Sequence, residues 1–520
     1  MKRLLSVLLS FILVLCVLAV STQAASVDTP DVVIFKENGY DFLFPDIVKK
    51  SDGNLLAVSY KSKSGASHAP YQFGDGLGTI VISEGSSDGK LWGNYKVLVS
   101  PESLAEWGLG VWYSKSTDSY YYSYEEAVKN NALLSVEARD PNLARLNDGT
   151  LLFTFFTRVP GKSRLGGHQY WSEGTSWYTW GRTYIMYSKD NGATWSAPEE
   201  IPCSHLDRNC AKRGNIAVYS DNSILIPLYG MSSAVTDSFS RSKWCTVNVR
   251  ATLNSSGKWI FTDEYVTNGK GNSLSVFGYG TTEASFGTTA DDITYAMIRY
   301  YKYDVGDPGG DVYVSQDKGV TWTKIGATNP NAMQAGFYRM NNGSFFVTWS
   351  QTPTPRTIYA RVFDPMRPWD GTESKLIYKN TSSSDIGDPS GIELENGSLL
   401  TIFYDTKDHH VAGAFRDSSF FFSEGCNHKF SEWQVTNKST CTKKGLKISV
   451  CSMCQSVRTE ETEQSHNFDG NKCTSCGYSK SEECTCNCHA DGIKKIIFSI
   501  INFFQKLFGI NKVCACGIAH

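Results

Sequence analysis

One pattern recurs six times between Pro45 and Asp405: an apolar alternation, a turn pair such as Asp-Gly or Asn-Gly, and a run of residues that favour strands. Each copy predicts a β-hairpin, because period-two apolar patterning on both sides of a tight turn is typical of paired strands. A single hairpin cannot bury its own faces. Six related hairpins therefore predict radial packing into a six-bladed β-propeller, an all-β fold. The copies begin at Pro45, Pro141, Gly214, Ala284, Ala335 and Pro389.

A second, shorter repeat lies between the hairpins, with the form S-x-D-x-G-x-T-W in its two best copies. Asp and Gly suit a turn whose side chain bonds to its own backbone, and Trp fills the space between sheets. The repeat resembles the Asp-box, or BNR, repeat of the sialidase (neuraminidase) superfamily. We expect Asp190 and Asp317 to hold their turns and to lie far from any chemistry. The copies are SKDNGATW from Ser188, SQDKGVTW from Ser315, and the eroded SSDGKLW from Ser86 and NSSGKW from Asn254.

Charge narrows the classes of partner. The chain has 520 residues, with 50 Lys and Arg against 52 Asp and Glu, which gives a formal net charge of −2. A balanced surface provides no global field for nucleic acid or anionic membrane. We expect a small, largely polar partner and no nucleic acid.

The first residues predict export. An apolar run, 4–20, follows Lys2 and Arg3, and small residues lead to Ala24. These are the three parts of a secretory signal peptide, which we place at residues 1–24. The mature protein is expected to be secreted or held at the cell surface. An N-terminal membrane anchor is the alternative.

Cysteine content divides the chain. Eleven of its 15 cysteines lie between Cys426 and Cys516. Such a change in composition marks a domain boundary. We therefore expect a propeller at 31–422, a Cys-rich module at 426–480 and a terminal Cys/His clasp at 481–520.

Two CxxC pairs in the Cys-rich module have the spacing of zinc knuckles. They are Cys451 with Cys454, and Cys473 with Cys476. Paired CxxC turns place thiolates on one tetrahedral ion, so the module is expected to hold structural zinc and to resemble a zinc ribbon. Disulfides are the alternative, because export favours oxidation. Further candidate ligands are His428, Cys441 and His466.

The terminal clasp brackets an amphipathic stretch. Ile493, Ile497 and Phe504 belong to its apolar stripe, and lysines occupy the other side. The stretch is too short and too polar to span a bilayer. We expect a helix that attaches to the cell surface or envelope, or one that packs within its own small domain. The cysteine pattern resembles the C-terminal modules of secreted proteins from Gram-positive gut bacteria.

The chemistry is expected at the propeller axis. Innermost strands start near the central channel, so the residues just before the repeated hairpins should face a common pocket. Carboxylates interleaved with a cation provide what a glycosidase needs, which is an acid, a base or nucleophile, and polar binding groups. Aligned on their turns, the repeats place Phe44, Asp140, Arg213, Glu283, Gln334 and Asp388 at these positions.

The sialidase resemblance covers residues 31–422 and implies roles for individual residues. Glu283, in TEASFG, is similar to the glutamate that polarises a tyrosine nucleophile in that family. Arg299 and Arg356 resemble two of the three arginines that bind the substrate carboxylate, or they are structural arginines paired with acids. Asp75 falls where the family keeps its acid/base aspartate. No cofactor for catalysis is implied.

Two positions depart from the family. Leu43 replaces the first arginine of the triad, and Asp385, with Asp388 nearby, stands where the nucleophilic tyrosine is expected. Two arginine forks hold a carboxylate less well than three. A carboxylate nucleophile also repels a carboxylated anomeric centre. The substrate is therefore expected to lack that carboxylate, with Glu283 and one of the two aspartates as nucleophile or base.

Two more residues are candidates for substrate binding. Arg139 lies at the same offset from Pro141 as the missing arginine from Pro45. It either compensates for that cation or pairs with Asp140. His68, in a loop, either reaches a sugar hydroxyl or stays solvated.

These features together predict an exported exo-glycosidase of the sialidase type, which releases a terminal residue from host or plant glycans. Sialic acid is the residue that the family resemblance implies first, whereas the two departures favour a sugar without the carboxylate. The alternatives are a different terminal sugar on the same fold and a non-catalytic glycan-binding surface protein.

Overall fold

The computed structural model describes residues 27–479 with gaps. The predicted signal peptide, the terminal clasp, His68, Asp75 and Cys454 lie outside the described residues. Within the described part of the chain, no helix has the length and apolarity that crossing a membrane requires. The internal segments left out are 66–75, 160–171, 174–175, 178–180, 204, 207–209, 232–243, 265–279, 302–307, 329–331, 352–355, 366–367, 370–372, 381–384, 422–429, 442–443, 452–456, 471 and 477–478.

The chain divides into two compact units. The first is Met1–Lys429 with Cys451–Val457, and the second is Phe430–Val450 with Arg458–His520. The finer boundaries that the sequence suggests stay predictions.

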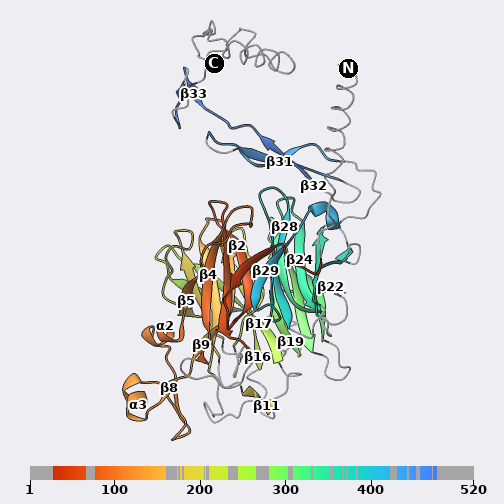
Figure 1. The fold of residues 1–520 in the computed structure, drawn as a ribbon. Coiled ribbons are helices and arrows are strands. Elements are labelled where there is room, and N and C mark those ends of the chain that lie inside the picture. Colours follow the sequence, from red (N-terminus) through yellow and green to blue (C-terminus); the bar gives the residue numbers. More distant parts are fainter. Residues whose placement is uncertain are drawn as a thin grey trace, which may run out of the picture. The chain divides into compact units, whose positions relative to one another are not determined.

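The first unit contains six four-stranded sheets within the described residues, and every pairing in them is antiparallel (Figure 1). Each predicted hairpin supplies the two leading strands of one sheet. The first three sheets are β2 (Tyr40–Lys49), β3 (Leu55–Lys63), β4 (Thr79–Gly85) and β5 (Lys96–Val99); β9 (Glu137–Arg145), β10 (Leu151–Arg158), β13 (Thr183–Ser188) and β14 (Glu199–Glu200); and β15 (Ala217–Val218), β16 (Ile224–Met231), β17 (Trp244–Leu253) and β18 (Trp259–Glu264).

The other three sheets follow the same order along the chain, except that the last one takes its outer strand from the beginning of the described chain. They are β19 (Thr281–Thr288), β20 (Thr294–Tyr301), β21 (Pro308–Ser315) and β22 (Thr323–Ala327); β23 (Ala332–Arg339), β24 (Phe345–Gln351), β25 (Thr357–Phe363) and β26 (Lys375–Lys379); and β27 (Ile386–Glu393), β28 (Leu399–Asp405), β29 (His410–Arg416) and β1 (Val32–Lys36).

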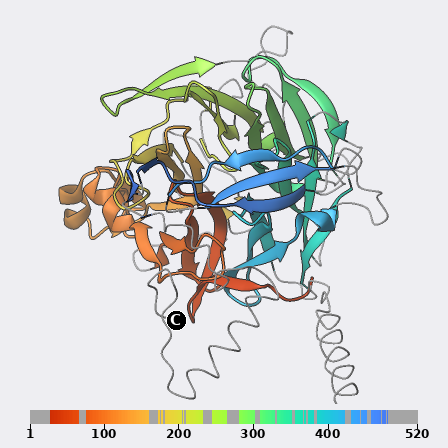
Figure 2. The same ribbon diagram turned by 90° about the horizontal axis from the view of Figure 1, so that it is seen from above.

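The six sheets form a closed series around a common centre (Figure 2). β2 contacts β9 on one side and β27 on the other, and β19 contacts β16 and β23, which in turn contacts β27. Leu146 and Ile216 join the second sheet to the third in one apolar cluster. β1 closes the series by pairing with β29, Val32 opposite Gly413. The prediction is confirmed in that this region is mostly β and its sheets are antiparallel.

The turns of the hairpins share one stabilising contact. Asp148 Oδ1 accepts a hydrogen bond of 2.9 Å from the amide of Thr150, two residues on. Gly149 between them has φ of 93°, a value that suits glycine. The same side chain to backbone bond recurs in four other hairpins, and this explains why Asp or Asn begins these five turns. The donating amides belong to Asn54, Ser223, Ser344 and Ser398, and the accepting side chains are those of Asp52, Asp221, Asn342 and Asn396, in that order.

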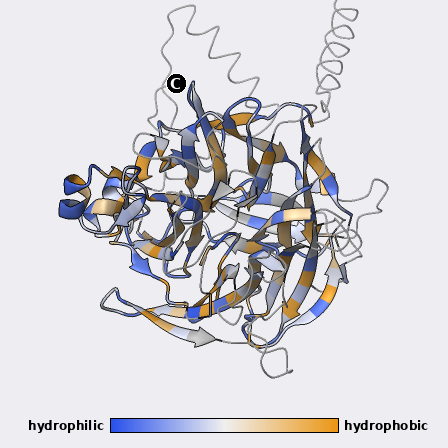
Figure 3. Cartoon of the chain, turned by 90° about the horizontal axis from the view of Figure 1, so that it is seen from below, coloured by the Kyte–Doolittle hydropathy of each residue, from blue (hydrophilic) through white to orange (hydrophobic). Residues whose placement is uncertain are grey.

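Apolar side chains fill the spaces between neighbouring sheets, and hydrophobic residues are concentrated along the strands (Figure 3). The second sheet shows how this follows from sequence. β10 reads LLFTFFTR and is buried at every position. Phe153 and Phe155 of this strand share a cluster with Leu56 and Val58 of β3. A strand covered on both faces needs no polar alternation, which is why its apolar run is nearly continuous.

The S-x-D-x-G-x-T-W segments form closed hydrogen-bonded turns. Asp317 Oδ1 accepts from the Thr321 amide at 2.7 Å, and its Oδ2 accepts from the Thr321 hydroxyl at 2.6 Å. Ser315 Oγ donates to the same carboxylate at 2.7 Å. Trp322 stacks on Phe286, with ring centroids 5.4 Å apart. Asp190 makes the same contacts with Thr194 and Ser188, so both carboxylates are held within their turns.

Besides the strands of the six sheets, the two units contain smaller elements, each two to six residues long. In the first unit they are α2 (Pro101–Glu106), β6 (Trp112–Ser114), β7 (Ser119–Tyr121), α3 (Tyr124–Lys129), β8 (Leu133–Leu134), β11 (Ser172–Glu173), β12 (Ser176–Trp177) and the 3-10 helix η4 (Ser418–Phe421). In the second unit they are β30 (Gln434–Asn437), β31 (Gly445–Val450), β32 (Val457–Thr462), β33 (Phe468–Asp469) and β34 (Lys472–Cys473).

Candidate functional site

A pocket opens at the centre of the six sheets, with an empty volume of about 350 Å³. Five of the six positions predicted from the repeat alignment line it. They are Phe44, Asp140, Arg213, Gln334 and Asp388. Glu283, the sixth, is not among its lining residues.

A bulge at one place in the innermost strands sets the direction of these side chains. In β2 the pairing shifts between Leu43 and Asp46, and β27 shifts between Gly387 and Ser390. The residue inside the bulge has a left-handed backbone, and a bulge redirects its side chain. A positive φ in a residue other than glycine is strained and persists only where the surroundings enforce it. These residues are Phe44 (φ 57°), Asp140 (φ 46°), Glu283 (φ 48°) and Asp388 (φ 50°).

Arg213 lies between two carboxylates of the pocket. Its Nη2 pairs with Asp388 Oδ2, and its Nη1 is 3.8 Å from Asp140 Oδ2. The guanidinium carbon lies 4.5 Å from the centroid of the Phe44 ring, a cation–π contact that fixes its plane. Asp388 Oδ1 is buried and has no hydrogen-bond partner among the described residues. Buried polar atoms usually have a partner, so this oxygen of a pocket-lining residue lacks one that a bound ligand can supply.

A belt of hydrogen bonds joins the sheets around the pocket. In its first half, Asp46 of β2 accepts from Ser390 Oγ of β27 at 2.6 Å and from Asn142 Nδ2 of β9 at 3.3 Å. Lys212 Nζ donates to Asn142 Oδ1 at 2.7 Å and to the Gly214 carbonyl at 2.6 Å. Three neighbouring sheets and the segment before β15 are thereby linked.

The second half of the belt completes the circle. Asn215 Oδ1 accepts from Ser285 Oγ of β19 at 3.0 Å and from the Phe337 amide of β23 at 2.7 Å. Thr348 Oγ1 of β24 donates to the Pro389 carbonyl of β27 at 3.0 Å. Several belt residues line the pocket themselves, so the belt fixes the arrangement of the lining, which favours preorganised chemistry.

Burial shifts the pKa values of the two charged members of the belt. Lys212 is fully buried, and this burial lowers its pKa to about 7, against the opposing attraction of Asp46 and Asp140. Burial also raises the pKa of Asp46, although Ser390 and the Leu143 amide donate to its carboxylate. Both groups are shifted toward their neutral forms, because charge is poorly solvated there.

Lys212 should make stability depend on pH. Between pH 7 and the unfolded lysine value of about 10.4, the unfolded chain binds more protons than the folded one. The free energy of unfolding should therefore rise with pH in this window, by up to about 1.4 kcal/mol per pH unit. Denaturant titrations at pH 7, 8 and 9 should show this slope in the wild type and lose it in Lys212→Met. Parallel pH profiles for the two proteins would show that Lys212 is charged in the folded state.

The three arginines expected to bind a substrate carboxylate already face acids of the chain. Arg299 Nη1 lies 2.5 Å from Glu283 Oε2. The other two pairs are Arg139 Nε with Glu137 Oε1, at 2.6 Å, and Arg356 Nη1 with Asp385 Oδ1. Arg139 also lies over the Tyr60 ring, with its guanidinium carbon 4.7 Å from the centroid. A guanidinium paired in this way has less capacity for an external carboxylate.

Two tyrosines near the sixth sheet have different surroundings. The Tyr404 hydroxyl hydrogen-bonds with Asp385, and its ring meets Phe44 edge-on at 6.0 Å. Burial raises the pKa of Tyr404 well above its ordinary value, and the Asp385 carboxylate adds to this. Tyr378 instead donates to Asp405 Oδ2 at 2.9 Å. Tyr404 is the tyrosine that adjoins the pocket.

The metal candidates meet in a combination different from the predicted one. Cys473 and Cys476 lie together with Cys441 and His466, two of the further candidate ligands. His428, the third, lies outside the described residues. Cys451 is buried and does not belong to this group.

Several residues of the site were missed by the sequence analysis. Asp46, Asn142, Asn215, Ser285 and Ser390 each stand two positions after a predicted pocket residue, as in Phe-Pro-Asp and Asp-Pro-Asn. The repeat alignment therefore contained this signal. Lys212 has no repeated counterpart, and no local pattern distinguishes it.

Comparison with solved structures gives likenesses at low identity. A protein of unknown function from Dyadobacter fermentans is 18% identical, with a TM-score of 0.53, and the match covers 75% of this chain and 98% of that one. Hadza microbial sialidase Hz136 is 14% identical, with a TM-score of 0.49, and the match covers 73% of this chain and 66% of that one. The intramolecular trans-sialidase from Ruminococcus gnavus is 11% identical, with a TM-score of 0.46, and the match covers 78% of this chain and 99% of that one. No family model and no curated protein matches this chain. The first likeness shows the fold alone.

Proposed function

We propose that this chain is an exported exo-acting glycoside hydrolase on a six-bladed, sialidase-like β-propeller, and that it removes an uncharged terminal sugar. One observation carries the proposal. Asp140 and Asp388 flank Arg213 in a preorganised central pocket, and one oxygen of Asp388 is unpartnered. Glycoside hydrolysis generally needs two carboxyl groups at the bond that breaks.

The two carboxylates take different roles in this proposal. Asp388 acts as nucleophile, or as the base that activates water, through its unpartnered Oδ1. Asp140, farther from the guanidinium, protonates the leaving oxygen. Arg213 orients Asp388 through the pairing of its Nη2 with Asp388 Oδ2. Asp75, the acid that the family resemblance implies, lies outside the described residues.

The make-up of the pocket supports a ligand-binding role. Its lining comes from the leading strands of four sheets, β2, β9, β23 and β27, and from the segment before β15. The strained backbone at Phe44, Asp140 and Asp388 provides further support, because such strain gathers at functional sites.

The charge of the pocket favours an uncharged sugar. Its described lining has three acidic side chains, Asp46, Asp140 and Asp388, and one basic one, Arg213. Leu43, in the place of the first family arginine, is fully buried. A carboxylated sugar would meet like charge here. We therefore favour a neutral hexose or deoxy sugar over sialic acid.

A glycan-binding protein without turnover is the second candidate, since Arg213 and the polar lining can also hold a sugar. A glycan array separates the two functions when it is read twice, once for bound protein and once for terminal sugars lost after incubation. We expect one class of neutral terminal sugar to disappear. Retention of the protein on glycans that stay intact would favour the binding protein.

A further inference from the structure

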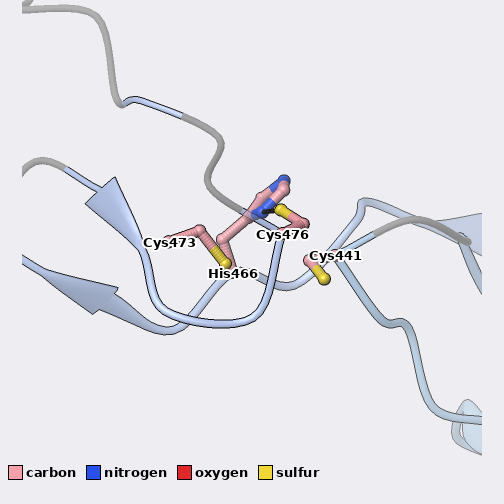
Figure 4. A group of neighbouring side chains, drawn as sticks. All are labelled: Cys441, His466, Cys473 and Cys476. Carbon is pink, nitrogen blue, oxygen red and sulfur yellow. Dashed lines mark hydrogen bonds between the residues drawn. The ribbon is translucent and has the colours of Figure 1, made fainter.

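A cluster of metal-ligating side chains lies within the second unit (Figure 4). Cys441, His466, Cys473 and Cys476 each offer one ligand atom, and these atoms all lie within 4.8 Å of one another. Cys476 Sγ is 3.6 Å from His466 Nδ1. Bonds of about 2.3 Å to sulfur in a tetrahedral zinc site place ligand atoms about 3.8 Å apart. A small contraction of the cluster therefore suffices to enclose an ion.

Backbone hydrogen bonds bring the ligand segments together. The Ser465 amide donates to the Thr440 carbonyl at 3.2 Å, and these residues immediately precede His466 and Cys441. The Thr474 amide, next to Cys473, donates to the Asn467 carbonyl at 2.9 Å. Three separate stretches of chain thus converge on the cluster before any metal is considered.

The Cys473–Cys476 turn has the local form of a metal knuckle. The amides of Ser475 and Cys476 both donate to Cys473 Sγ. Two amides directed at one sulfur fix its position in the turn, as a CxxC knuckle requires. The turn follows the short β33–β34 hairpin, in which Phe468 pairs with Cys473.

Among the residues of the second unit whose side chains the structure describes, Cys473 is the one buried apolar side chain. Val435 is 58% exposed and Phe468 is 39% exposed. Small units without a sufficient core usually depend on disulfides or a structural metal.

We propose that Cys441, His466, Cys473 and Cys476 bind one Zn²⁺ in a closed, structural site that holds the second unit together. Three thiols and an imidazole are an established donor set for tetrahedral zinc. A disulfide accounts for them less well, because pairing two of the three thiols leaves the third thiol and the imidazole without a role. The site goes beyond the proposed glycosidase, since all its ligands lie outside the pocket-bearing unit.

Residue-resolved alkylation of the full chain tests the site. The protein, purified with Zn²⁺ present, is treated with iodoacetamide before and after chelation, and each cysteine is read by mass spectrometry. We expect Cys441, Cys473 and Cys476 to react only after chelation. Cys476 is the most informative, because its side chain is exposed and burial cannot protect it. Alkylation before chelation, or a requirement for reductant, would overturn the proposal.

Zinc content provides the second test. His466→Ala removes one ligand and no thiol, so bound zinc should fall by one equivalent per chain relative to the wild type. His409→Ala, a half-exposed histidine of the first unit that pairs with Asp41, is the matched control and should keep the full content. Unchanged zinc in His466→Ala would contradict the assigned ligand set. Glycoside turnover should survive the loss of zinc in either outcome, so this test is independent of the proposed activity.

Discussion

Asp388→Asn should lower kcat/KM on the preferred glycoside by about 10³-fold, within the range of about 10²–10⁴ that acid–base or nucleophilic groups supply. The amide cannot attack an anomeric carbon or take a proton from water. Because asparagine has nearly the size of aspartate, the backbone bulge and the contact with Arg213 should keep their geometry. The effect should fall on kcat, with KM changed much less. Initial rates on the neutral glycoside identified by the array give both constants.

Asp221→Asn is the matched control for this variant. Asp221 is an acid of a hairpin turn, with a side chain 56% exposed that pairs with Lys318. It should leave kcat/KM unchanged. A loss of less than tenfold in Asp388→Asn, with its thermal stability preserved, would remove Asp388 from the chemistry and leave Asp140 as the principal carboxylate.

Sialosides should be poor substrates compared with neutral glycosides. The absence of one arginine fork from a buried carboxylate costs about 2–5 kcal/mol, and the remaining family-like arginines are paired with Glu137, Glu283 and Asp385. We therefore expect kcat/KM on 3′-sialyl-lactose to be at least about 30-fold below that on the preferred neutral glycoside. Sialosides and neutral glycosides that share one fluorogenic leaving group make the comparison direct.

A sialoside value of about 10⁴ M⁻¹s⁻¹ or more, an ordinary enzyme efficiency, would contradict this expectation. In that case an arginine must leave its acid when substrate binds. Arg356 is the first to examine, because its side chain is 29% exposed, more than that of Arg139 or Arg299. Arg356→Lys should then lower sialoside turnover specifically.

Local patterns were sufficient to predict most of the fold. Alternating apolar residues around Asp-Gly and Asn-Gly turns predicted the hairpins that became the leading strands of all six sheets. Alignment on those turns also found Phe44, Asp140, Arg213, Gln334 and Asp388, because the same bulge recurs at one position of the repeat. The spacing of apolar residues along a strand and the residue types of a turn are short-range properties, so the sequence shows them directly.

The partners of individual charges could not be predicted in this way. Glu283 has the strained backbone of the pocket positions, yet its carboxylate meets Arg299 from the next strand. Lys212 is buried through a contact with Asn142, 70 residues away. Such pairings depend on how sheets pack, which no local pattern records.

The cysteine module shows the same limit. CxxC spacing identified Cys473 and Cys476, since two residues between cysteines suit one turn. It also favoured Cys451 over Cys441 as a third ligand. The structure instead brings in Cys441 through the backbone bond between Ser465 and Thr440. That contact joins residues 25 apart in the chain, beyond the reach of spacing rules.

Product analysis on a mixed pool of mucin and plant glycans tests the central claim most directly. The wild type and Asp388→Asn are incubated with the pool, and free monosaccharides are identified by mass spectrometry. We predict that the wild type releases one class of uncharged terminal sugar and that Asp388→Asn releases almost none. Release of sialic acid as the main product would contradict the proposed substrate class, and no release by a wild type that still binds the glycans would contradict the enzyme.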